Sequence, residues 1–265
     1  MINNTFRSLA VILMLLLPRL IFAQDNKAFE KGSFSSKGYT LPYRILFPDH
    51  FDPQKKYPLI LVLHGAGERG DDNEAQLKYG TKLFLNDTIR SKYAAIIIFP
   101  QCPAADFWSN VKMQDDSVTK KLKWVFTHDM PPTKAMQALM GMVDEFLDKP
   151  YVDKHKMYVG GLSMGGMGTL EIIGRMPGVF AAAFSCCGGD NTLNAKKYAK
   201  KVPLWIFHGQ KDSVVPYTHS ESIVAAIKEA GGKPRYTLYP NDDHNCWNNA
   251  FAEPDLIPWL FAHNR

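Results

Sequence analysis

A glycine-rich stretch around one serine constrains the fold of this chain more than any other feature. It reads VGGLSMGGMG over residues 159–168 and contains the pattern Gly-x-Ser-x-Gly, centred on Ser163. A strand is predicted just before the pattern and a helix just after it. A strand-to-helix turn this sharp strains the serine, and side chains two positions to either side would collide with neighbouring elements. Glycine at 161 and 165 removes that collision, so the pattern predicts a turn that projects the Ser163 hydroxyl.

The rest of the chain alternates apolar runs with segments of helical periodicity. Continuous apolar runs are typical of strands that are buried on both faces. Strands are predicted over 39–48, 58–65, 94–100, 156–161, 180–186, 203–209 and 235–240, and helices over 133–149, 167–176, 219–232 and 255–263. Strands and helices in alternation predict an α/β fold with a mostly parallel central sheet and helices on both faces. No linker divides residues 24–265, so we expect one catalytic domain there.

The first 23 residues differ in character from the rest. Arg7 precedes the apolar run Leu9–Leu17, and a small residue, Ala23, ends the segment. This pattern predicts a signal peptide that is removed after Ala23, and hence a secreted or periplasmic protein. The alternative is an uncleaved membrane anchor, but Pro18 and Arg19 interrupt the run before it reaches the ~20 apolar residues that a membrane span needs.

Charge and cysteine content narrow the function only slightly. The formal net charge is +5, and the first 23 residues contribute two arginines and no acidic residue to it. A balance this weak gives no basis for a nucleic-acid partner. Four cysteines follow the predicted cleavage site, Cys102, Cys186, Cys187 and Cys246, and their disulfide pairing stays open. Their spacing matches no metal site, and we expect neither a metal nor a cofactor.

A serine hydroxyl is a weak nucleophile unless a base stands beside it. In a strand–serine–helix arrangement, the acid and then the histidine follow the serine along the chain. His244 meets this order and lies just past the last predicted strand, at the sheet edge toward which Ser163 should point. We therefore predict His244 as the base.

The acid that orients this histidine should also follow the end of a strand. Asp212 comes just after the strand predicted over 203–209 and would hold the imidazole in the correct tautomer. Asp190, Asp242 and Asp243 compete for the same role.

An ester or amide cleaved by a serine also needs donors for the negative oxygen of the intermediate. The loop His64-Gly65-Ala66-Gly67 follows the strand predicted over 58–65. The backbone N–H of Ala66, together with that of Met164, would face this oxygen. The alternative is a plain glycine turn that ends a strand.

Five segments together carry a resemblance to a known family: LHGAGERGDDN, PQCP with the nearby Trp108, GLSMGG, HGQKDSVVP and DHNCW. From Tyr39 to its end the chain resembles the α/β-hydrolases, and within them the secreted bacterial serine esterases known as predicted peptidases or dienelactone-hydrolase-like proteins. This group is similar to feruloyl and acetylxylan esterases. The resemblance implies that Ser163, Asp212 and His244 form the catalytic triad. Dienelactone hydrolases proper use a cysteine where this chain has serine, which argues against that particular activity.

Substrate contacts are predicted at three positions. Arg69, in the segment GERG, could lie near the acid portion of the substrate or could hold the loop of Ala66 through an ion pair. Trp108 and Trp247 could floor the pocket or pack in the core. The segment 104–132 lacks clean periodicity and is predicted to form a functional flap, with disorder as the alternative.

These features predict a serine carboxylesterase that acts on phenolic or short-chain acyl esters of plant carbohydrates through an acyl-enzyme. Its partner would be a small-molecule or carbohydrate ester, with no nucleic acid and, after signal cleavage, no membrane. Two alternatives remain open: a serine peptidase with the same triad, and a non-catalytic binding protein on a hydrolase fold.

Overall fold

The computed structural model describes residues 26–36, 38–115 and 122–265. The predicted signal peptide, residues 1–23, lies outside the described residues. Within those ranges, no helix combines the length and the apolar character that crossing a bilayer requires.

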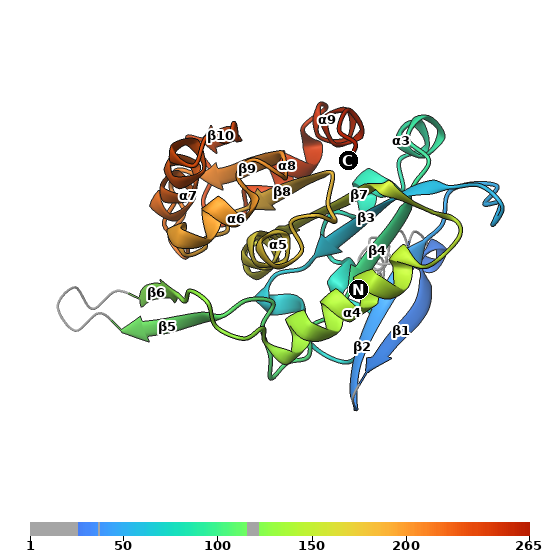
Figure 1. Ribbon diagram of the computed structural model, residues 1–265, viewed down its shortest axis with the longest axis horizontal. Helices are drawn as coiled ribbons and strands as arrows, with labels where there is room; N and C mark the ends of the chain where they lie inside the picture. Colours follow the sequence, from blue (N-terminus) through green and yellow to red (C-terminus); the bar gives the residue numbers. More distant parts are fainter. Residues whose placement is uncertain (1–25, 37, 116–121) are drawn as a thin grey trace, which may run out of the picture.

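An eight-stranded sheet organises the molecule, with the strand order β1-β2-β4-β3-β7-β8-β9-β10 (Figure 1). Its strands are β1 (Glu30–Ser36), β2 (Tyr39–Leu46), β3 (Tyr57–Leu63), β4 (Ile96–Pro100), β7 (Val152–Leu162), β8 (Ala182–Cys186), β9 (Leu204–Gly209) and β10 (Arg235–Tyr239). β2 runs antiparallel to both of its neighbours, and the strands from β4 to β10 in this order are parallel. The loops that follow the parallel strands therefore meet at one edge of the sheet, where ligands bind in folds of this kind.

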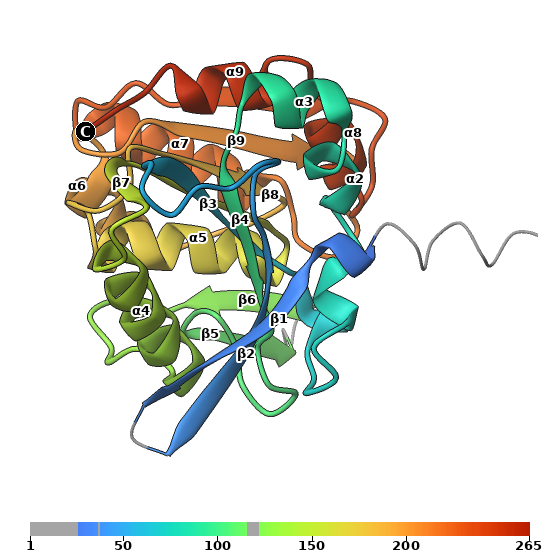
Figure 2. The ribbon, with the colours of Figure 1, turned by 90° about the vertical axis from the view of Figure 1, so that its right-hand side faces the viewer.

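Helices cover both faces of the sheet (Figure 2). One face carries α4 (Lys134–Leu147), α5 (Met164–Arg175), α6 (Ala195–Tyr198) and α7 (Thr218–Glu229), and the other carries α2 (Thr81–Phe84), α3 (Asp87–Lys92), α8 (Trp247–Ala252) and α9 (Leu256–Phe261). Short 3-10 turns lie at Asn26–Ala28, Ala66–Glu68, Ala75–Leu77 and Thr192–Asn194. The predicted α/β-hydrolase architecture is confirmed.

The central strand β3 shows why the sheet needs two helical layers. Its side chains alternate between the faces, and all of them after Pro58 are buried. Leu59, Leu61 and Leu63 join the core under α4 and α5. Ile60 and Val62 join the core under α8 and α9. A strand that is apolar on both sides is stable only when both sides are covered.

The segment predicted to be an irregular flap contains a regular hairpin. β5 (Val111–Asp115) and β6 (Leu122–Phe126) form a two-stranded antiparallel sheet of their own. The hairpin projects from the body of the molecule in Figure 1. From the middle of β6, the indole N–H of Trp124 donates a hydrogen bond of 2.8 Å to the carbonyl of Val214. This bond joins the hairpin to the loop that follows β9.

The strand β1 was not predicted from the sequence. Its residues, EKGSFSS, are half-buried or exposed, and none is fully buried. β1 pairs with β2 at the edge of the sheet, so backbone hydrogen bonds rather than an apolar pattern define it.

Candidate active site

The turn around Ser163 has the strained geometry that the sequence predicts. Ser163 has φ 52° and ψ −116°, a conformation that L-residues rarely adopt. A Cβ at Gly165 would lie 2.0 Å from the carbonyl oxygen of Leu63, and one at Gly161 would lie 2.5 Å from that of Gly165. Both positions therefore accept only glycine, and the turn depends on them.

Ser163, His244 and Asp212 come from three separate strand ends and form a chain of hydrogen bonds. Oγ of Ser163 lies 2.8 Å from Nε2 of His244. Nδ1 of His244 lies 2.8 Å from Oδ2 of Asp212. A carboxylate only accepts, so Nδ1 carries the ring proton and Nε2 is left to accept from the Ser163 hydroxyl.

The carboxylate of Asp212 is surrounded by N–H groups. Oδ1 accepts hydrogen bonds from the backbone N–H of Val214 at 2.9 Å and of Val215 at 2.8 Å. Oδ2 faces both His244 and His208, whose Nε2 lies 3.2 Å away. Burial opposes ionisation of Asp212, but hydrogen bonds from His208, His244 and Val215 outweigh it and hold the pKa well below its usual value. Asp212 therefore stays negative across the neutral range.

The three competing acids lie elsewhere. Asp243 accepts from the N–H and the hydroxyl of Ser213, at 2.7 and 2.8 Å. Asp242 accepts from the side chain of Asn249 at 2.6 Å. Asp190 accepts from the side chain of Asn194 at 2.9 Å.

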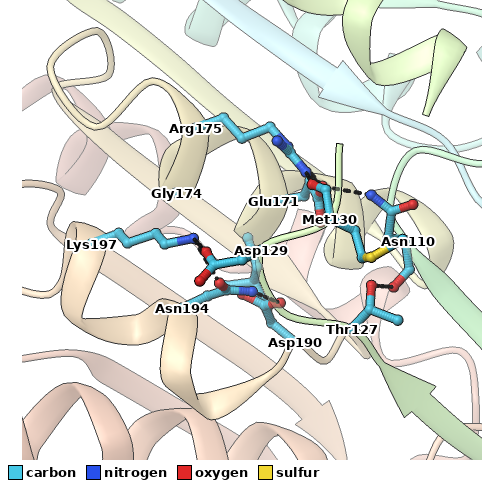
Figure 3. A pocket seen from close by; sticks show the side chains of 11 residues that line it. Asn110, Thr127, Asp129, Met130, Glu171, Gly174, Arg175, Asp190, Asn194 and Lys197 are labelled. Atoms are coloured by element: carbon cyan, nitrogen blue, oxygen red, sulfur yellow. Dashed lines mark hydrogen bonds and ion pairs between the residues drawn. The ribbon is translucent and has the colours of Figure 1, made fainter. Parts of the chain in front are cut away.

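Asp190 belongs to a polar cavity of about 170 Å³ between the segments that flank the hairpin, α5 and α6 (Figure 3). Two ion pairs line this cavity, Arg175 with Glu171 at 2.6 Å and Lys197 with Asp129 at 2.9 Å. Burial raises the pKa of Asp190 to about 7. None of Ser163, His244 and Asp212 lines this cavity.

The two backbone N–H groups predicted to face the negative oxygen lie at the starts of helical turns. Met164 is the first residue of α5, and Ala66 is the first residue of a 3-10 turn. The first N–H groups of a helix have no partner inside the helix, so both are free of intrahelical bonds. A helix N-terminus also favours negative charge. These are the properties that a site for a negative oxygen needs.

The loop that carries Ala66 is held by a buried histidine. Nδ1 of His64 donates to the carbonyl of Gly65 at 2.6 Å, and Nε2 accepts from the N–H of Cys102 at 2.9 Å. The indole of Trp108 donates to the carbonyl of His64 at 3.3 Å. Burial lowers the pKa of His64 to about 4, so its ring is neutral above that pH.

Arg69 contacts the protein backbone. Its guanidinium donates to the carbonyl of Ala66 at 3.0 Å and to that of Asp106 at 3.2 Å, and it lies over the ring of Phe107. The alternative of a structural role therefore describes Arg69 better, although hydrogen bonds replace the ion pair that was expected. The neighbouring Glu68 instead lies 3.6 Å from Lys78.

The two tryptophans predicted at the pocket differ in position. Trp108 is 0% exposed and packs between the ring of His64 and Gly168. This corrects its assignment to the pocket floor, because a side chain with no exposed surface belongs to the core. Trp247 is 8% exposed and belongs to the core on the other face of the sheet, although its ring centroid lies 5.3 Å from that of His244.

A disulfide joins Cys187, just after β8, to Cys246, two residues beyond His244. Cys102 and Cys186 are free and buried. The sequence left this pairing open. The disulfide ties the loop of His244 to the sheet edge that also carries Ser163.

A family model for phospholipases and carboxylesterases matches residues 52–254. Among curated proteins, the bifunctional acetylxylan esterase/xylanase of Neocallimastix patriciarum is 30% identical over 191 residues, 71% of this chain and 24% of that protein. A putative dipeptidyl aminopeptidase of Schizosaccharomyces pombe is 22% identical over 271 residues, 91% of this chain and 29% of that protein. The chain thus spans about a quarter to a third of the length of these relatives.

Solved structures support the same fold. A thermostable esterase is 32% identical, with a TM-score of 0.78 over 91% of this chain and 64% of that one. A ferulic acid esterase from Anaeromyces mucronatus, solved with ferulic acid, has a TM-score of 0.59 at 16% identity, over 84% of this chain and 86% of that one. At the latter identity, the likeness concerns the fold alone.

The buried, neutral His64 predicts a pH dependence of stability. Its pKa is about 4 when folded, and the ordinary value of 6.5 applies when unfolded, so the unfolded chain takes up a proton as pH falls between these values. From pH 7 to pH 5, this linkage should lower the free energy of unfolding by about 2 kcal/mol. Denaturant unfolding of the parent and of His64→Asn at both pH values measures it.

The parent and His64→Asn should lose different amounts of unfolding free energy between pH 7 and pH 5. That difference reports on His64 alone, because every other titratable group is present in both proteins. Asp190, whose pKa is raised to about 7, acts with the opposite sign and cancels in the comparison. An equal loss of stability in parent and variant would contradict the assignment.

Proposed function

Because this chain belongs to the phospholipase/carboxylesterase family of α/β-hydrolases, we propose that it is a serine esterase that works through an acyl-enzyme. The observation that carries the proposal is the unbroken hydrogen-bond chain from Ser163 through His244 to Asp212. The backbone N–H groups of Ala66 and Met164, at the starts of a 3-10 turn and of α5, are the proposed donors to the negative oxygen.

In the first half of the reaction, Oγ of Ser163 attacks the ester carbonyl as Nε2 of His244 takes the hydroxyl proton. The carbonyl oxygen becomes negative and is stabilised by the N–H groups of Ala66 and Met164. The tetrahedral intermediate then collapses. The ester C–O bond breaks, and His244 returns the proton to the departing alcohol, which leaves an acyl-serine.

In the second half, water takes the place of the alcohol. Nε2 of His244 removes a proton from this water, and the hydroxide attacks the acyl carbonyl. The bond to Oγ of Ser163 breaks, the proton returns to Oγ, and the free acid departs. The site ends in its starting state, and the reaction consumes only water.

Asp212 contributes by position and charge. Its Oδ2 holds the proton on Nδ1 of His244, which keeps Nε2 free to act as the base. It also stabilises the imidazolium that forms when His244 takes a proton. Removal of its charge should therefore impair both halves of the reaction.

The proposed substrates are phenolic or short-chain acyl esters of plant carbohydrates. The names of two similar proteins, an acetylxylan esterase/xylanase and a ferulic acid esterase, motivate this class. Trp124, beside the loop of Asp212, offers an aromatic ring for a flat acyl group, whereas Trp247 beside His244 is 8% exposed and offers little surface. Stacking and apolar burial against such a ring favour a phenolic acid over acetate.

A peptidase with the same triad is the second candidate, because the putative dipeptidyl aminopeptidase of S. pombe is also similar. Amide cleavage uses the same groups with a poorer leaving group. A catalytically idle binding protein is a third, and reaction of Ser163 with a fluorophosphonate probe would exclude it.

We also propose that the protein is exported. The apolar segment after Arg7 motivates this proposal, and the disulfide between Cys187 and Cys246 is consistent with an oxidising compartment. N-terminal sequencing of the mature protein from a producing cell should begin at Gln24. An intact Met1 would contradict it.

The triad predicts a definite ranking of variants. Ser163→Ala should lower ester turnover by at least ~1,000-fold, and a further His244→Ala should add little because the residues act as a unit. Asp212→Asn should lower turnover by ~10,000-fold, because the amide favours the wrong tautomer of His244. Hydrolysis of a short activated ester measures each.

Asp243→Asn is the matched control, since Asp243 is the next residue to His244 yet bonds to Ser213. Asp243→Asn should lower ester turnover far less than Asp212→Asn. The reverse ranking would overturn the assignment of the acid, and high activity in Ser163→Ala would overturn that of the nucleophile.

Specificity constants for methyl ferulate, acetylated xylan, a long-chain triglyceride and a peptide anilide test the substrate class. We expect the first two to exceed the others. Trp124→Ala should lower the preference for ferulate over acetate, because it removes one aromatic wall.

Met113→Ala is the control for Trp124, since Met113 is its cross-strand partner and is 52% exposed. It should leave the preference unchanged. If the peptide anilide has the highest specificity constant, the peptidase candidate replaces the carbohydrate esterase. If Trp124→Ala leaves the preference for ferulate over acetate unchanged, the Trp124 ring is not a wall of the pocket.

A further inference from the structure

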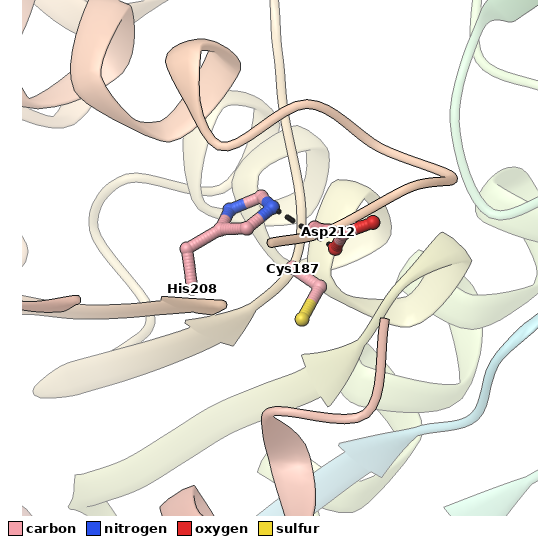
Figure 4. Close-up of side chains that lie close together, drawn as sticks. All are labelled: Cys187, His208 and Asp212. Atoms are coloured by element: carbon pink, nitrogen blue, oxygen red, sulfur yellow. Dashed lines mark ion pairs between the residues drawn. The ribbon is translucent and has the colours of Figure 1, made fainter. Parts of the chain in front are cut away.

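A second histidine faces the carboxylate of Asp212 from inside the protein. His208 lies in β9, directly before Gly209, and is 0% exposed. Its Nε2 lies 3.2 Å from Oδ2 of Asp212, the same oxygen that bonds to His244 (Figure 4). Oδ2 therefore sits between two imidazoles, one toward the serine and one toward the core.

The surroundings of His208 specify which nitrogen carries its proton. Nε2 also lies 2.9 Å from the carbonyl oxygen of Val215, which can only accept. Nε2 must then be the donor, and its N–H is shared between Val215 and Asp212. Nδ1 lies 2.7 Å from Oγ of Ser220, whose hydroxyl can donate to it.

The same contacts fix the loop that carries the acid. Val215 supplies its carbonyl to His208 and its N–H to Oδ1 of Asp212, at 2.8 Å. One imidazole thus bonds to both the carboxylate and the backbone that shapes it. A rotation of the carboxylate would break at least two of these contacts.

We propose that His208 is a positioning residue, which acts through Asp212 to aim Oδ2 at Nδ1 of His244 and to share the negative charge of that oxygen. The inference rests on the proposed role of Asp212 in ester hydrolysis. Hydrogen bonds from His208 and His244 both help to keep the pKa of Asp212 below its usual value against the effect of burial.

The other titratable groups around this pair are few among the described residues. His219 on α7 faces His208, and burial lowers its pKa. Asp243 lies near Asp212 and bonds to the backbone N–H of Ser213, which lowers its pKa. Cys187 lies within 4.8 Å of both His208 and Asp212, a spacing that could suit a metal ion. Its sulfur is in the disulfide with Cys246, however, and so is not a thiolate ligand.

The shared charge has a measurable consequence. If Oδ2 loses the donor from His208, its full charge acts on Nδ1–H of His244, and the imidazolium form of His244 becomes more favourable. A larger fraction of His244 is then protonated and unable to act as a base. The pH at which activity is half-maximal, on the acid side, should therefore rise.

Two substitutions of His208 by an amide test the proposal, and their side chains differ in length by one methylene. In His208→Gln the amide N–H₂ reaches the position of Nε2 and can donate to Asp212. In His208→Asn the shorter amide keeps a polar group near Ser220 but does not reach Asp212. We expect His208→Asn to lower kcat by about 10- to 100-fold, the factor of one hydrogen bond to a charged group, and to raise the acid-side midpoint. His208→Gln should recover most of both.

Ser220→Ala is the structural control, because it removes the partner of Nδ1 and leaves the contact of Nε2 with Asp212. It should lower stability without moving the acid-side midpoint. Fluorophosphonate titration gives the fraction of correctly folded sites, so kcat refers to those alone. If His208→Asn and Ser220→Ala behave alike, with unchanged midpoints, His208 has only a packing role and the proposal is overturned.

A measurement on the unaltered protein guards against variants that do not fold. Nitrogen-15 NMR of the His208 ring should show the proton on Nε2, and a neutral ring with its proton on Nδ1 would overturn the proposal. This readout is independent of the reaction. Failure of the esterase assignment would appear as turnover in Ser163→Ala, whereas failure of this inference would appear in the tautomer and in the pH midpoint.

Discussion

The close approach of α5 to the backbone of β3 and β8 is the contact on which the site depends. A Cβ at Gly165 would fall 2.0 Å from the carbonyl oxygen of Leu63, and one at Gly166 would fall 2.6 Å from that of Cys186. With no side chain between them, the helix begins at Met164, directly after the serine. The proposed nucleophile and one proposed donor for the negative oxygen therefore depend on the same backbone contact. The strain at Ser163 is held by the surrounding packing.

The site also requires that the buried negative charge of Asp212 carry only a small desolvation free energy. A carboxylate removed from water is expensive unless donors replace the lost solvent. Asp212 has a side chain with 0% exposure, and four N–H groups surround its two oxygens. Two of them come from its own loop, so the backbone that presents the acid also solvates it. The other two are imidazoles from β9 and from the loop after β10, and this is how one charge links three segments of the chain.

Strand ends and order along the chain were readable from the sequence, because buried parallel strands appear as continuous apolar runs. This located Ser163, Asp212 and His244 after separate strands, and the structure brings their polar atoms into hydrogen-bonding distance. The burial of Trp108 could not be predicted in this way, because Trp108 packs against Gly168, which is distant in the sequence. The place of His208 beside the carboxylate was not predicted either, although its position four residues before Asp212 was the available signal. The hairpin of β5 and β6 is not hydrogen-bonded to the main sheet, and its residues show no clear apolar pattern.

The disulfide between Cys187 and Cys246 closes a covalent ring across a sequence separation of 59 residues. β9, α7 and β10 lie inside this ring, and with them Asp212 and His244. A single cut in the polypeptide anywhere between the two cysteines would leave both fragments joined. Ser163 would then stay connected to its base through sulfur rather than through peptide bonds. Such a ring would allow a chain nicked by a protease to keep all three side chains of the site in one molecule.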